Sequence, residues 1–148
     1  MRIWVDADAC PRAIKDILYR AANRCRVELT LVANRALAAP PSPYIRSIVV
    51  PAGFDVADDE IVKRVDPGDL VISSDLPLAA QLIAKGARVL SQRGEWISEA
   101  NIGPLLSVRN FMTSLREAGV DTGGAAQLGA GEKQAFAAHL DRFLAGRD

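Results

Sequence analysis

Acidic residues recur in this chain at the ends of apolar runs that are typical of β-strands. The run 2–5 ends directly before an Asp-Ala-Asp segment, and the run 70–72 ends shortly before another aspartate. A further acidic pair falls in the first turns of a helix that the pattern predicts over 54–65. The residues concerned are Asp6, Asp8, Asp58, Asp59 and Asp75. If these carboxylates converge, they form a strongly negative site.

A cluster of carboxylates needs compensation for its charge. Two of them about 4 Å apart repel by roughly 4 kcal/mol at an effective dielectric constant of about 20, so the cluster requires a cation, a shared proton or an arginine partner. Oxygen ligands suit a hard divalent ion, so the cofactor we expect is Mg²⁺ or Mn²⁺. The expected metal ligands are Asp6, Asp58, Asp59 and Asp75, and the expected catalytic residues are Asp6, Asp8, Asp58 and Asp75.

Most of these aspartates also have a structural interpretation when taken alone. Asp75 stands directly before a predicted helix and suits its N-cap, and Asp8 suits the cap of the helix that begins shortly after it. Acidic side chains in a first helical turn favour the helix dipole, which accounts for Asp58 and Asp59. Asp6 has no such local role, because it ends a strand that we expect to be buried.

Short apolar runs alternate with helix-like segments along the chain. The expected strands are 2–5, 27–33, 47–50, 70–72 and 87–90, and the expected helices are one from Pro11, then 54–65 with Asp55 as N-cap, 76–85, 102–118 and one after 131. This alternation predicts an α/β fold, a three-layer parallel sheet with helices on both faces. Ligands bind such sheets beyond the carboxyl ends of the strands, which is where the acidic residues are expected to lie.

The composition favours one packed domain over 1–148, with the glycine-rich stretch 123–131 before the last helix as the linker candidate. The 18 basic and 18 acidic side chains cancel, which argues against a nucleic-acid binder held by bulk charge. Only five residues precede the first carboxylate, and no apolar run approaches the roughly 20 residues that span a bilayer. We therefore expect a cytoplasmic protein without a signal peptide or a membrane partner.

Arginine and serine side chains supply candidate phosphate contacts. Arg109 and Arg116 lie seven positions apart and share a face of their predicted helix, and Arg93 follows the last predicted strand. Arginine binds phosphate in a bidentate manner, although its long stem also covers apolar surface while the head stays solvated. Ser73 and Ser74 have no histidine partner for a catalytic triad, so we interpret their hydroxyls as contacts to a phosphate or to a metal-bound water.

The cysteines and the histidine suggest no further metal site. Cys10 and Cys25 lie fifteen positions apart and form no zinc-binding spacing, and the single histidine, His139, lies far along the chain. Cys10 stands near a predicted helix N-terminus, where a thiol pKa falls and the sulfur becomes a nucleophile. The alternative is a small, half-buried side chain without a chemical role.

Several motifs resemble those of the YaiI/YqxD family, a bacterial family of unknown function. They are VDADACP at 5–11, GFDVAD at 53–58 and DLVISSDLPLAA at 69–80, with Arg93-Gly94, the segment 109–116 and Gly123-Gly124 in addition. The family is similar to the PIN-like nuclease superfamily, whose members use carboxylates at strand ends to hold Mg²⁺ or Mn²⁺ and cut RNA. The resemblance implies a PIN-like fold, with Asp6, Asp75 and either Asp58 or Asp59 as the acidic set.

These observations lead to the hypothesis of a metal-dependent phosphodiesterase that acts on nucleic acid, RNA in preference to DNA. A first alternative is a phosphatase of the haloacid-dehalogenase type, with Asp6 as nucleophile, Asp8 as general acid and Lys85 as its lysine. A second alternative is a PIN-like fold without catalysis that binds RNA or protein. The oligomeric state is not predicted.

Overall fold

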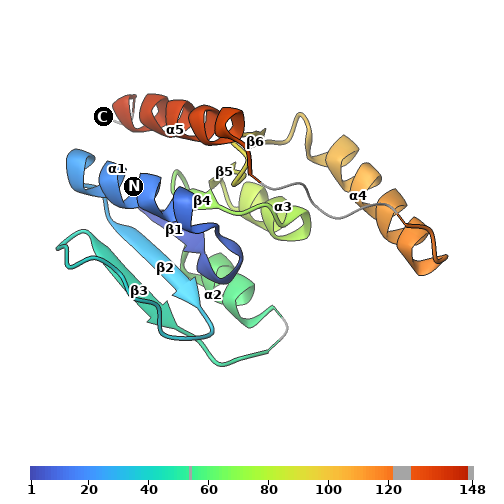
Figure 1. The fold of residues 1–148 in the computed structure, drawn as a ribbon, viewed down its shortest axis with the longest axis horizontal. Helices are drawn as coiled ribbons and strands as arrows, with labels where there is room; N and C mark the ends of the chain where they lie inside the picture. Colours follow the sequence, from blue (N-terminus) through green and yellow to red (C-terminus); the bar gives the residue numbers. More distant parts are fainter. Residues whose placement is uncertain (54, 122–127, 147–148) are drawn as a thin grey trace.

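The computed structural model describes residues 1–53, 55–121 and 128–146, and these contain one six-stranded sheet (Figure 1). The strands are β1 (Ile3–Asp6), β2 (Leu29–Ala33), β3 (Ile45–Val49), β4 (Leu70–Ile72), β5 (Arg88–Leu90) and β6 (Trp96–Ile97). Their order in the sheet is β3-β2-β1-β4-β5-β6. The first five strands are parallel, and β6 pairs antiparallel with β5 at the edge.

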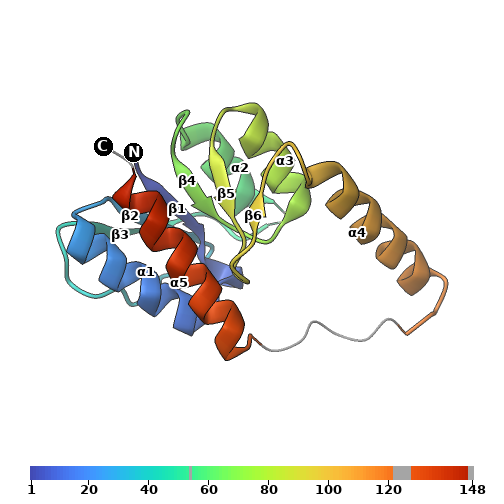
Figure 2. The ribbon, with the colours of Figure 1, turned by 90° about the horizontal axis from the view of Figure 1, so that it is seen from above.

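Helices cover both faces of this sheet, which confirms the predicted three-layer α/β architecture. The helices are α1 (Arg12–Cys25), α2 (Val56–Arg64), α3 (Leu76–Ala84), α4 (Ile102–Glu117) and α5 (Ala130–Ala145), with a short 3₁₀ turn, η1 (Ala7–Ala9), after β1. One core cluster packs α1 and α5 against the sheet, and a second packs α2 and α3 against its other face. Figure 2 shows the two pairs on opposite sides of the strands.

The alternation of β1 and β4 residues decides which face each side chain enters. Ile3 and Val5 belong to the core under α1, whereas Trp4 belongs to the core under α2 and α3. Trp4 pairs in register with Val71 of β4, which enters the same second core. Because side chains alternate along a strand, Asp6 lies on the side of α2 and α3.

Helix α4 differs from the other helices because none of its residues is buried. It contacts α3 and then extends away from the sheet, as Figures 1 and 2 both show. Val108 and Phe111 are its most exposed large apolar side chains. Within the part of the chain that the structure describes, no helix is long and apolar enough to cross a membrane.

The edge strand β6 is the element that the sequence pattern did not predict. It is two residues long and follows a turn in which Gly94 has a φ of +82°. A Cβ atom at Gly94 would lie 2.6 Å from the backbone nitrogen of Phe136, so this glycine permits α5 to approach the turn. The sheet is therefore mostly parallel, with one antiparallel edge.

Two further expectations concern the start of α2 and the glycine-rich stretch. Helix α2 begins at Val56, and Asp55 occupies the predicted N-cap position, but it has a φ of +61° and its side chain makes no cap hydrogen bond. The expected helix start at Phe54 lies outside the described residues, as do positions 123–127 of the glycine-rich stretch. The division into one domain over 1–148 stays a prediction.

Candidate functional site

The carboxyl edge of the sheet contains a topological switch point between β1 and β4. The chain runs from β1 outward through β2 and β3, and then returns to continue on the other side through β4 and β5. Ligands of open parallel sheets bind in the crevice that such a reversal creates. Asp6 ends β1, and the segment 73–75 follows β4 at the same edge.

Asp75 is held in place by the start of α3. Its Oδ1 atom accepts a hydrogen bond from the Leu78 N–H at 3.0 Å, so Asp75 is the N-cap that the sequence predicts. Its own N–H donates to the Ser73 Oγ atom at 3.1 Å, and Ser73 is buried. The cap leaves the second carboxylate oxygen of Asp75 for other contacts, so capping does not exclude a role in a site.

Asp58 lies in the first turn of α2 and approaches Asp75 and Asp6. Its pKa is raised to about 7, mainly by burial, with the negative charges of Asp6, Asp75 and Asp55 and a hydrogen bond to Asp75 as the further causes. A carboxylate with this pKa lacks a nearby cation to stabilise its charge. Asp59, its exposed neighbour, lies at the mouth of the same hollow.

Asp6 is half-buried and shares the same deficit of positive charge. Burial raises its pKa, and the charges of Asp75 and Asp8 add to the shift. Asp8 is exposed, and its carboxylate accepts a hydrogen bond from the Asn34 N–H at 2.8 Å. Asp8 therefore fixes the loop after β2, and its predicted capping of α1 is wrong because Pro11 occupies that N-cap.

The fit of a divalent cation depends on the donor atoms and on their charge. In the described part of the chain, no group of three or more His, Cys, Asp or Glu side chains is arranged around a metal position. The donors of Asp6, Asp58 and Asp75 are nevertheless all carboxylate oxygens, the type that Mg²⁺ and Mn²⁺ prefer. Burial and mutual repulsion raise the pKa of Asp6 and of Asp58, and a bound cation would offset this repulsion. The donor atoms therefore suit such an ion.

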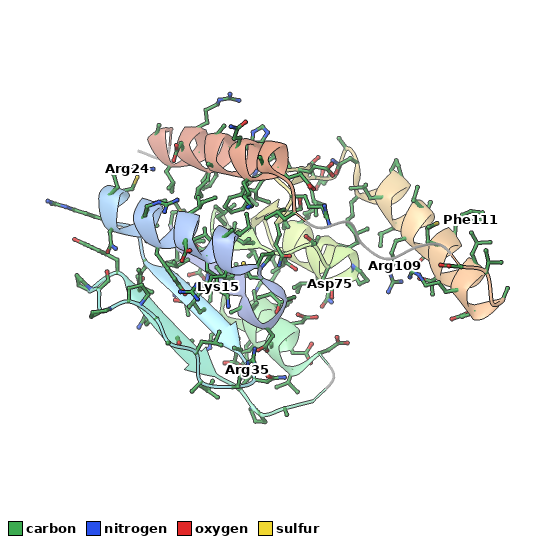
Figure 3. All side chains as sticks on the ribbon, viewed as in Figure 1. Lys15, Arg24, Arg35, Asp75, Arg109 and Phe111 are labelled. Atoms are coloured by element: carbon green, nitrogen blue, oxygen red, sulfur yellow. The ribbon has the colours of Figure 1, made fainter. Side chains whose placement is uncertain are left out.

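A hollow of about 250 Å³ opens beside Asp58 and Asp75. Its lining residues come from α2, α3 and α4 and are Asp55, Asp58, Asp59, Asp75, Pro77, Leu78, Gln81 and Arg109. Figure 3 shows Arg109 on the side of α4 that faces Asp75, whereas Phe111 lies on the far side. Arg109 donates to the Asn110 side chain and forms no ion pair with these acids among the described residues.

The other predicted phosphate contacts lie outside this hollow. Arg93 donates to Glu132 of α5 at 2.5 Å and lines a separate cavity of about 200 Å³ with Ser74. The Ser74 Oγ atom accepts from the Gln92 N–H at 3.2 Å, so this hydroxyl ties two strand ends together. Arg116 is exposed near the end of α4 and does not line the hollow.

The structure corrects the nucleophile interpretation of Cys10. Its side chain is buried, and this burial raises the pKa of the thiol to about 12. A protonated thiol is a poor nucleophile, so the structural alternative fits. Sequence reasoning also missed Gln81, one helical turn after Leu78 on α3, because nothing in its local pattern marks it as part of a site.

Comparisons with known proteins support one family. Residues 4–146 match the sequence model described as "Uncharacterized BCR, YaiI/YqxD family". A UPF0178 protein of Halorhodospira halophila is 61% identical over 147 residues, which cover 99% of this chain and 97% of the relative. A UPF0178 protein of Shewanella woodyi is 59% identical over 144 residues, which cover 97% and 95%. No solved structure gives a significant match. The chain belongs to the YaiI/YqxD family.

Proposed function

We propose that this protein is a metal-dependent phosphodiesterase that acts on RNA. One observation carries the proposal. Asp6, Asp58 and Asp75 come from three different elements and approach one another at the switch point, where burial and the neighbouring charges raise the pKa of Asp58 to about 7. Capping of α3 explains the position of Asp75 but not the approach of three carboxylates, and perturbed groups in a crevice are typical of functional sites.

The roles of the acidic residues follow from their positions. Asp6, Asp58 and Asp75 would hold Mg²⁺ or Mn²⁺, with Asp59 at the mouth of the hollow and Asp8 beside Asp6. The bound ion would supply the Lewis acidity that offsets negative charge on a phosphodiester. Ser73 and the N-terminus of α3 orient Asp75 through its backbone and its carboxylate, so Asp75 needs little reorganisation to bind.

Arg109 is the residue that we assign to the phosphate of the substrate. It lines the hollow from α4, opposite the carboxylates of α2 and α3, and so offers a positive group at the point where an anionic strand would enter. Arginine forms two parallel hydrogen bonds to a phosphate, which positions the backbone without reading the sequence. The choice of RNA rests on the resemblance to PIN-like nucleases.

The phosphatase alternative receives no support from the arrangement. Lys85, its proposed lysine, lies just after the end of α3, and its ammonium group donates to the Val62 carbonyl. Asp75 stands at the start of the same helix, so the helix separates Lys85 from the acidic cluster. The binding module without catalysis remains as an outcome of the experiment below.

The test is cleavage of a labelled single-stranded RNA with Mn²⁺ and with EDTA. We expect cleavage with Mn²⁺ only, and a loss of at least about 100-fold in Asp6→Asn, because the variant keeps the shape of the side chain and removes its charge. Asp16→Asn, an exposed residue of α1 outside the hollow, is the matched control and keeps full activity.

Two results would overturn the proposal. Equal trace cleavage by the wild type and by Asp6→Asn would identify a contaminating nuclease. RNA binding that persists in EDTA and in Asp6→Asn, without cleavage, would instead support a binding module.

A further inference from the structure

A second and larger cavity lies at the opposite, amino edge of the sheet. It measures about 890 Å³ and is lined by Met1, Gly68, Gly86, Arg88, Trp96, His139, Arg142, Phe143 and Gly146. Gly68 precedes β4 and Arg88 begins β5, while His139 to Gly146 belong to the last turns of α5 and its end. The volume is in the range of small-molecule sites. None of the residues that line the acidic hollow takes part in it.

Arg88 is held in this cavity by aromatic rings. Its guanidinium carbon lies 4.6 Å from the centre of the Trp96 ring and 5.5 Å from that of Phe143. Trp96 in turn contacts Phe143 at 5.7 Å and His139 edge-on at 6.2 Å between ring centres. Stacking occupies the flat face of a guanidinium and leaves its N–H edge available, which is the edge that binds a planar or tetrahedral anion.

The charges around the cavity have one sign. Arg88 and Arg142 are both exposed and both line it, and none of the described lining residues is acidic. No ion pair to either arginine is present among the described residues. The floor includes Gly68 and Gly86, joined by a hydrogen bond from the Gly68 N–H to the Gly86 carbonyl at 3.0 Å. Side chains therefore do not fill this part of the cavity.

We propose that this cavity binds a nucleotide, with the phosphate on Arg88 and Arg142 and the base against the ring system of Trp96 and Phe143. Packing alone explains the aromatic rings, because Trp96 and Phe143 both contact the core under α1. It does not explain two arginines at the rim of the same cavity that form no ion pair within residues 1–53, 55–121 and 128–146. An anion with an aromatic group satisfies both features, and bases stack on arginine planes as well as on rings.

The same chemistry is available in a free mononucleotide and in the terminal nucleotide of a strand. The proposal does not depend on the acidic site, because the two cavities share no residue. The probes are therefore AMP, inorganic phosphate, and a dinucleotide with a 5′-phosphate. Tighter binding of the dinucleotide than of AMP would identify a strand end as the source, and equal binding would identify the free nucleotide.

Tryptophan fluorescence reports on this cavity specifically. The chain has two tryptophans, and Trp4 is only 2% exposed with its indole N–H donated to Asp69. Trp96 is half-buried at the cavity, so we expect AMP to quench Trp96. Trp96→Phe should lose the signal while calorimetry still detects binding, because phenylalanine keeps a ring for stacking.

The arginine variants decide the proposal. We expect AMP to bind with a Kd of about 1 mM or tighter, and Arg88→Ala and Arg142→Ala each to weaken binding at least about tenfold. Arg46→Ala, an exposed arginine on β3 at the far side of the sheet, is the matched control and leaves the Kd unchanged. Asp58→Asn should also leave it unchanged, which separates this result from a failure of the proposed nuclease.

Three results with AMP as the probe would overturn the proposal, and a fourth concerns inorganic phosphate. The three are the absence of AMP binding to the folded wild type, a Kd that Arg88→Ala and Arg142→Ala both leave unchanged, and an equal loss in Arg46→Ala. Inorganic phosphate binding as tightly as AMP would also overturn it, because the base would then contribute nothing. Far-UV circular dichroism of each variant confirms that the exposed substitutions leave the fold intact.

Discussion

Two aspartates at opposite ends of the β1–β4 pair show how differently one fold treats a carboxylate. Asp69, directly before β4, is 3% exposed, and it accepts hydrogen bonds from the Arg2 N–H at 3.0 Å, the Trp4 indole N–H at 3.1 Å and the Asp66 N–H at 3.0 Å. The Arg2 guanidinium lies 3.6 Å away. Asp58, at the other end, faces other aspartates instead.

The two carboxylates differ in burial, since Asp69 is buried and Asp58 only half-buried, and they differ above all in their partners. Three N–H donors and an arginine offset the loss of hydration at Asp69, so that carboxylate fastens β1 to β4. At Asp58 the neighbouring charges add to the cost of burial, so the folded chain carries unfavourable electrostatic energy there. The carboxylate with full partners has a structural role, whereas the arrangement at Asp58 is the basis for the proposed cation site.

The largest effect on stability should come from the satisfied carboxylate. Asp69→Ala leaves the buried Trp4 indole N–H without its acceptor and removes one of the two acidic partners of Arg2. We expect the free energy of unfolding to fall by about 3 kcal/mol, measured by urea denaturation. Asp66→Ala, an exposed neighbour that also pairs with Arg2, is the control and should cost far less. A loss below about 1 kcal/mol for Asp69→Ala would refute the structural role.

Asp58→Asn should act in the opposite direction and stabilise the protein. The pKa of this carboxyl rises from 3.8 to about 7 on folding, so its favourable contribution is present below 3.8 and is lost as pH rises through about 7. The whole pKa shift of Asp58 would correspond to about 4 kcal/mol in the free energy of unfolding, and the partial exposure of the side chain reduces this to about 2 kcal/mol.

The measurement is thermal unfolding in EDTA at pH 4 and at pH 8. The Asn variant should gain its advantage over the wild type at pH 8 and little of it at pH 4. Asp59→Asn, the exposed neighbour on the same helix turn, is the control for the loss of one negative charge from α2. If Asp58→Asn is less stable than the wild type at pH 8, the negative charge of Asp58 is not unfavourable in the folded chain.

Mn²⁺ should stabilise the wild type at pH 8. An ion present at ten times its Kd and bound only by the folded chain adds about 1.4 kcal/mol. The gain should disappear in Asp58→Asn, because the ion then loses a ligand and a negative charge. The melting temperature is compared with Mn²⁺ and with K⁺ at equal ionic strength. An equal rise in both salts would indicate general screening rather than a site.

The sequence predicted the elements that position the acidic cluster. The apolar runs 2–5 and 70–72 are strands β1 and β4, and the polar residues after them mark the carboxyl edge. Asp6 and Asp75 lie at one edge because β1 and β4 are neighbouring parallel strands, and the periodicity predicted these strands but not their neighbourhood. The family resemblance was also correct.

The features that the sequence did not predict depend on contacts between residues far apart in the chain. The choice between Asp58 and Asp59 depends on the phase of α2, which begins at Val56 after a left-handed Asp55. Arg93 was an equal candidate with Arg109 until its pairing with Glu132 of α5 became visible, and that pair spans 39 positions. Short strands such as β6 have too few residues to show a periodicity at all.

The smallest expected effect concerns a carboxylate that has a partner but remains exposed. Asp141 of α5 accepts a hydrogen bond from Arg24 of α1 at 2.6 Å, and both side chains are 57% exposed. Water solvates both charges in the unfolded chain almost as well, so Asp141→Ala should cost only about 0.5 kcal/mol or less, and still less at high salt. Arg24→Ala should cost the same within error in the same urea titrations. A loss as large as that of Asp69→Ala would mean that a charged partner alone stabilises a carboxylate. A small loss would show that burial decides how much a carboxylate with a partner stabilises the fold.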